Sequence, residues 1–165
     1  MSELPYRDTK PQGAAGFYSA INSTFRFLLR RMGEEGWRRQ LADLGHSYYA
    51  PVNAQWRQGG LPAVSRYWRE FFAAEPGARV EVVEHPDRVE INVVVCPAIH
   101  HLRAANRQIV PEYCRHCYYL GSVRAEAAGL EMRLCGGNGS CIHTYARQEA
   151  NLPPQDISAI REATP

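Results

Sequence analysis

Lysine is almost absent from this sequence, since Lys10 is the only one and the remaining basic residues are arginines. The formal net charge is only +2, which gives no reason to expect a nucleic-acid partner or binding to a membrane surface. Long apolar runs are also absent, and none reaches the roughly 18 residues of a membrane-spanning helix. The segment from Met1 to Gln12 is polar and lacks the hydrophobic region of a signal peptide. We therefore expect a cytoplasmic protein whose partner is a small molecule, and the sequence does not indicate its oligomeric state.

The cysteines argue against two further classes of protein. They number five, an odd count that does not fit a paired disulfide framework. Cys114 and Cys117, in Cys-Arg-His-Cys, form a Cys-x-x-Cys motif, but a second such motif at zinc-ribbon spacing is missing. No histidine follows Cys117 directly, which argues against covalent c-type haem attachment. In a reducing cytoplasm the thiols stay free and are available for metal binding or catalysis.

Hydrophobic periodicity divides the chain, which is long enough for a single domain, into a helical part over 1–75, a sheet-bearing part over 78–146 and a tail over 151–165. In the helical part, we expect Gly33 to end one helix and Pro62 to stand in the first turn of another. The apolar residues at helical spacing are Phe17, Ile21, Phe25, Leu28, Leu29 and Met32, then Trp37, Leu41 and Leu44, then Val64, Tyr67, Trp68, Phe71 and Phe72.

Two β-hairpins are expected in the second part. The first turns at residues 85–87 and ends at Cys96-Pro97, because proline cannot continue a strand. The second turns at the glycine-rich residues 136–139, and helices over 98–107 and 111–129 connect the two hairpins. One further helical turn should follow Asp156. This order predicts an α+β fold, with an antiparallel sheet of two hairpins, about four strands, covered by the N-terminal and intervening helices.

Three of the cysteines stand near expected helix starts. Cys96 follows a strand and precedes a helix, where the helix dipole favours a thiolate, and a buried inert cysteine is the alternative. Cys114 and Cys117 fall on one face of a helix and could bind a metal, form a redox pair or do neither.

Strand register makes Cys141 and His143 informative. If the turn consists of the four glycine-rich residues, Leu134 pairs with Cys141 and Met132 pairs with His143, and alternation directs both to the core face. A buried imidazole needs a partner, so His143 is a candidate base or ligand, or else a satisfied core residue. Cys135 should point away from the core and have no role.

The stretches Val95-Cys96-Pro97, Pro111 to Cys117 and Gly139-Ser140-Cys141 together resemble the L-2-amino-thiazoline-4-carboxylic acid hydrolase family. The resemblance covers the last third of the chain. It implies hydrolysis of a non-peptide carbon–nitrogen bond in a cyclic amidine-like thiazoline carboxylate, which water opens to a carbamoyl-cysteine. Cys96, Cys117 and Cys141 match the recurring cysteines of the family. Leu120 stands where the family has an acidic residue, so a divergent enzyme of secondary metabolism also fits.

These residues lead to the hypothesis of a hydrolase in which Cys96 is the nucleophile and His143 or His116 is the general base. Cys141 would position the substrate or share a metal. Arg103 or Arg115 would pair with the carboxylate of the substrate.

Two other classes stay open. In a metal-binding sensor or partner-binding module, Cys96, Cys114, Cys117 and Cys141 would converge on zinc or an iron–sulfur cluster, with His143 as a replacement ligand. In a small-molecule carrier, a pocket would lie between the aromatic helices and the sheet. If the thiols lie close together in space, the hydrolase and the metal-binding module are favoured, and if they lie far apart, the carrier is favoured.

Overall fold

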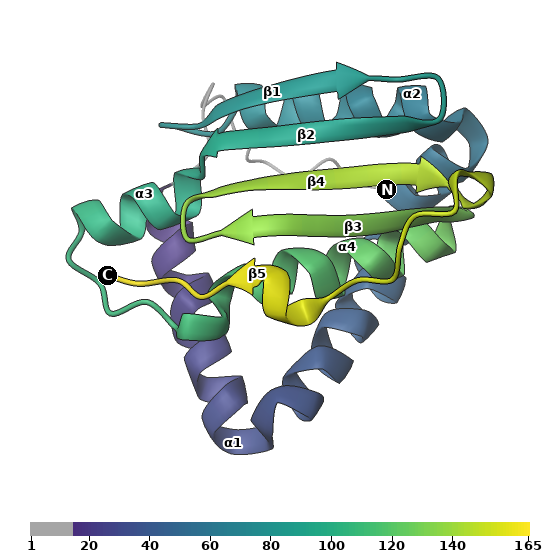
Figure 1. Ribbon diagram of the computed structural model, residues 1–165. Coiled ribbons are helices and arrows are strands. Elements are labelled where there is room, and N and C mark those ends of the chain that lie inside the picture. Colours follow the sequence, from purple (N-terminus) through teal and green to yellow (C-terminus); the bar gives the residue numbers. More distant parts are fainter. Residues whose placement is uncertain (1–14) are drawn as a thin grey trace, which may run out of the picture.

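The computed structural model describes residues 15–165, so the polar segment from Met1 to Gln12 lies outside the described residues. The described chain forms four α-helices and one mixed sheet in the strand order β1-β2-β4-β3-β5 (Figure 1). The expected α+β fold is confirmed, with one short strand more than expected. The helices are α1 (Gly16–Ser47), α2 (Ala50–Ala73), α3 (Pro97–Ala104) and α4 (Arg115–Ala127), and the strands are β1 (Arg79–Glu84), β2 (Arg88–Val95), β3 (Leu130–Gly137), β4 (Ser140–Arg147) and β5 (Ile160–Arg161).

Both long helices bend at a glycine. Gly33 in α1 has φ +69° and Gly60 in α2 has φ +59°, a backbone conformation that other residues rarely adopt. Gly33 therefore ends the first segment of α1 as expected, and α1 folds back as a V (Figure 1). Pro62 stands in the first turn after the second bend, also as expected. The part of α2 that precedes Gly60 was not expected from the sequence.

The turn of the second hairpin differs from the turn expected from the sequence. Asn138 and Gly139 alone form the turn, with φ +57° and +105°, as a two-residue turn of type I′ requires. The expectation of a four-residue turn is therefore wrong, and His143 pairs with Leu134 on β3 and with Ile91 on β2. The register differs from the expected one by two residues, so the faces are unchanged and His143 is buried as expected.

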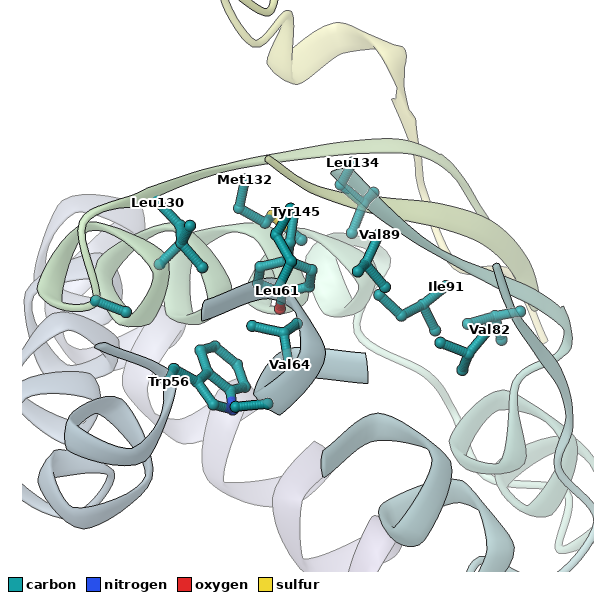
Figure 2. Close-up of a cluster of buried hydrophobic side chains, with 14 of the residues drawn as sticks. Trp56, Leu61, Val64, Val82, Val89, Ile91, Leu130, Met132, Leu134 and Tyr145 are labelled. Carbon is teal, nitrogen blue, oxygen red and sulfur yellow. The ribbon is translucent and has the colours of Figure 1, made fainter. Parts of the chain in front are cut away.

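The main core lies between the sheet and the helices α2 and α4, which cover the same face of the sheet (Figure 1). Figure 2 shows how side chains from the strands meet those of α2 in this cluster. The residues labelled there are Trp56, Leu61 and Val64 of α2, Val82, Val89, Ile91, Leu130, Met132 and Leu134 of β1–β3, and Tyr145 of β4.

A second buried cluster forms where α1 packs against α3 and α4, around Trp37, Leu102 and Tyr113. Cys96 and Cys114 pack against both clusters, so the two thiols lie at the seam between them. None of the helices over residues 15–165 combines the length and apolarity that crossing a membrane requires.

The tail contains the expected helical turn after Asp156, a 3-10 turn at Ile157–Ala159, in which the Asp156 side chain accepts a hydrogen bond from the Ser158 N–H. The short strand β5 that follows pairs in parallel with the end of β3. This strand was not expected, because two residues are too few for a periodic signal.

The sheet face that α2 covers should dominate stability. Ile91 is 0% exposed, whereas Ile142 on the opposite face is 43% exposed. We expect Ile91→Ala to lower the free energy of unfolding by about 2–5 kcal/mol, since it removes buried methyl groups and leaves a cavity. Ile142→Ala, the matched control, should cost less than about 1 kcal/mol. Urea unfolding of the two variants measures the difference, and equal losses would contradict this placement of the core.

Candidate functional site

The tight turn between β3 and β4 is hydrogen-bonded to two of the candidate cysteines, Cys96 and Cys114. The backbone N–H of Cys96, which precedes α3, donates to the carbonyl of Gly139 at 2.9 Å. The N–H of Asn138 donates to Cys114 Sγ at 3.2 Å. Arg103 of α3 in turn donates to the Asn138 side chain at 2.5 Å. The turn, the start of α3 and the 3-10 turn before α4 are thus fastened together.

Cys141 and Cys117 pack against the main core cluster, as Cys96 and Cys114 do. Cys141 lies opposite Gly136, where a Cβ would stand 2.9 Å from the Cys141 Cα, so glycine permits the close approach of the strands. The pKa of the Cys141 thiol is raised by charge on Cys117, Cys96 and Cys114, in that order after burial. The four thiols come from three places in the sequence, and all of them pack against the main core cluster. Cys135 is exposed, as expected.

Burial keeps these thiols protonated. It raises the pKa of Cys96 and of Cys117 to about 12 and that of Cys114 to about 11, and it raises the pKa of Cys141 as well. Cys96 was expected to favour the thiolate at the start of a helix. The N–H groups of Ile99 and Ala98 do lower its pKa, but burial outweighs them. That part of the expectation is wrong.

One thiol has a hydrogen-bonded imidazole. Cys141 Sγ lies 3.3 Å from His143 Nε2 on the same face of β4. His143 is 4% exposed, and its Nδ1 has no hydrogen-bond partner among the described residues. Burial, and secondarily the charge of His116, lowers the pKa of His143 to about 4. Cys141 and His143 are thus a neutral thiol–imidazole pair at physiological pH.

The second imidazole is placed differently. His116 Nδ1 is hydrogen-bonded to the Tyr113 carbonyl, so Nδ1 carries the proton. Cys117 Sγ lies 3.6 Å from His116 Nε2 and 4.0 Å from Nδ1. These nearly equal distances place the sulfur beside the ring and off the lone-pair axis of Nε2. Burial lowers the pKa of His116 to about 4. His116 is therefore a weaker partner for a thiol than His143.

The expected metal site is not assembled in this structure. Within residues 15–165, no three or more His, Cys, Asp or Glu side chains are arranged so that they could hold a metal ion. The structure therefore shows no ligand sphere formed by the expected set of Cys96, Cys114, Cys117 and Cys141 with His143.

The two arginines expected near the substrate are engaged elsewhere. Arg103 donates to the Thr164 carbonyl at 3.1 Å in addition to Asn138. Arg115 forms ion pairs with Glu34 and Glu162, each at 3.3 Å. Both therefore hold segments of the protein together.

Sequence reasoning missed Arg124, which is 3% exposed on the buried side of α4. Its guanidinium carbon lies 4.2 Å from the ring centres of both Tyr49 and Trp56. No sequence signal could have found it, because an arginine in a helix is typical of a solvated face.

Comparisons with protein-family models, curated proteins and solved structures find no match to this chain.

The buried His143 should make the fold sensitive to acid. Its pKa is about 4 in the folded protein and about 6.5 in an unfolded chain, so between these values the unfolded chain binds the extra proton. The contribution of His143 to the free energy of unfolding is therefore fully present above pH 6.5. It falls by about 3 kcal/mol as the pH drops towards 4. Urea unfolding of the protein and of His143→Gln between pH 7 and 4.5 measures this effect.

The variant should lose part of that pH dependence, because glutamine does not titrate. His46→Gln, which changes an exposed histidine, is the control and should keep the original slope. An unchanged slope in His143→Gln would contradict the assignment.

Proposed function

We propose that this protein is a hydrolase of a non-peptide carbon–nitrogen bond in a small cyclic amidine-like or thiazoline-type carboxylate. The observation that carries the proposal is the Cys141–His143 pair, 3.3 Å apart, at a core cluster against which Cys96, Cys114 and Cys117 also pack. The likeness of the stretches around Cys96, Cys117 and Cys141 to thiazoline carboxylate hydrolases supports the same substrate class. A cytoplasmic location would keep these thiols reduced.

The geometry favours Cys141, more than Cys96, as the nucleophile. A nucleophilic thiol needs a base within hydrogen-bonding reach, and Cys141 has that base in His143. The thiol would transfer its proton to His143 Nε2 as its sulfur adds to the ring carbon between two heteroatoms. In the protonated amidine, the double bond between this carbon and the ring nitrogen becomes single as the sulfur adds. His143 would then pass its proton to that nitrogen as the carbon–nitrogen bond of the ring breaks, and the nitrogen would leave as the amine of the product. Water would next add to the same carbon, the bond from the carbon to the Cys141 sulfur would break and a proton from the water would restore the thiol, so the net reaction consumes one water molecule.

The raised pKa of the Cys141 thiol fits this substrate class. A cyclic amidine is a cation when protonated, and a cation next to a buried thiol lowers the pKa of that thiol. The substrate itself would therefore favour the thiolate at the moment of attack. Without substrate, the neutral pair is stable and unreactive.

The test is an assay of ring opening with 2-amino-thiazoline-4-carboxylate, in which carbamoyl-cysteine is measured by mass spectrometry. Cys141→Ser and Cys141→Ala should lose at least about 1,000-fold in turnover, and His143→Gln about 100- to 10,000-fold, the range for loss of a general base. Cys135→Ser, which changes an exposed thiol, is the matched control and should keep full activity.

Cys96→Ser and Cys96→Ala separate the two possible nucleophiles. Full turnover in the Cys141 variants with loss in the Cys96 variants would return the role to Cys96. Absence of turnover in the unaltered protein, together with stoichiometric zinc or the visible absorbance of a cluster, would favour the metal-binding module.

A further inference from the structure

Arg124 is a buried cation enclosed by aromatic rings. Besides Tyr49 and Trp56, the rings of Tyr67 and Trp68 have their centres 5.0 and 5.8 Å from its guanidinium carbon. The residue is 3% exposed, and its Nε and Nη2 atoms have no hydrogen-bond partner among the described residues. The faces of the guanidinium are therefore covered while one edge is left unpaired.

That unpaired edge has the shape of a carboxylate site. The N–H groups of Nε and Nη2 point in the same direction and form the side-on fork that binds both oxygens of a carboxylate. Arginine stays charged in proteins, and aromatic faces offer it no hydrogen-bond acceptor. Buried donors without a partner are costly, and an anionic ligand would supply the missing acceptors.

Arg124 and His143 share Trp68 as a neighbour. The Trp68 ring lies 6.1 Å from the His143 ring and 6.2 Å from the Tyr145 ring, centre to centre. Burial raises the pKa of the Tyr145 hydroxyl, and the nearby charge of Arg124 opposes this rise. Arg124 and His143, each with an unpartnered buried nitrogen among the described residues, thus lie against the same aromatic side chain.

We infer that Arg124 binds the carboxylate of the small substrate, while Cys141 and His143 act on its ring. This inference rests on the proposed function and names the residue that recognises the acid group. Tyr49, whose ring covers a face of the guanidinium, stands in the short connection between α1 and α2 and is only half-buried, so a ligand would reach Arg124 by displacing this ring.

Calorimetric binding to the unaltered protein is the first test, with 2-amino-thiazoline-4-carboxylate and its neutral 4-carboxamide as probes. The carboxylate should bind at least about tenfold more tightly, because the carboxamide supplies only one oxygen acceptor and no charge. Equal affinity for the two probes would overturn the inference, and this comparison needs no variant to fold.

Arg124→Gln should weaken binding of the carboxylate by about 10- to 100-fold and leave binding of the carboxamide nearly unchanged. Arg124→Lys, which keeps the charge but loses the fork, should fall between. Arg66→Gln makes the same change at an exposed position of α2 and should bind as the unaltered protein does. Circular dichroism establishes that each variant is folded.

The outcomes separate the two proposals. Binding of the carboxylate that depends on Arg124, in a protein without ring-opening activity, would support this site and contradict the hydrolase. Ring opening with the same KM in the unaltered protein and in folded Arg124→Gln would support the hydrolase and overturn this site.

Discussion

The antiparallel pairing of β4 with β2 is the contact on which the rest of the structure depends. It joins two hairpins that are far apart in the sequence, and it places Cys141 opposite Val93 and His143 opposite Ile91. Cys96 follows directly after β2, so the same pairing brings the turn of the second hairpin to the start of α3, where the Cys96 N–H meets the Gly139 carbonyl. Without this pairing, the thiols would belong to two separate hairpins.

Removal from water then determines the charge of each group at the site. It raises the pKa of the thiols and lowers that of the imidazoles, so Cys141 and His143 meet as neutral partners. Arginine cannot become neutral in this way. At Arg124 the aromatic rings replace water on the faces of the guanidinium, and such cation–π contacts contribute about 2 kcal/mol or more when desolvated. They do not accept hydrogen bonds from the N–H groups, so Nε and Nη2 stay without a hydrogen-bond partner among residues 15–165.

The sequence predicted which face of the sheet a residue occupies better than it predicted the residue's partner on the neighbouring strand. Alternation has a period of two, so the two-residue error in the turn left His143 in the core although its partner became Leu134. Gly33 could be predicted as a break because glycine alone tolerates its φ of +69° at little cost. The sequence indicated that a buried His143 would need a hydrogen-bond partner, but it did not identify Cys141 as that partner. Arg124 was beyond reach, because its burial depends on how α2 and α4 pack, and local periodicity carries no information about that packing.

On the proposed function, a ligand with opposite charges at its two ends would suit this interior better than a ligand with only one of these charges. The thiols favour a neighbouring cation, because it offsets the cost of forming a buried thiolate, and Arg124 favours an anion, because its fork lacks acceptors. An amidinium carboxylate satisfies both demands at once and brings no net charge into the protein. An amidine without an acid group would leave Arg124 unpaired, and a carboxylate without an amidine group would leave the Cys141 thiol protonated. The proposed site would therefore select the zwitterion through the electrostatics of burial, and Trp68 is the side chain that lies next to both Arg124 and His143.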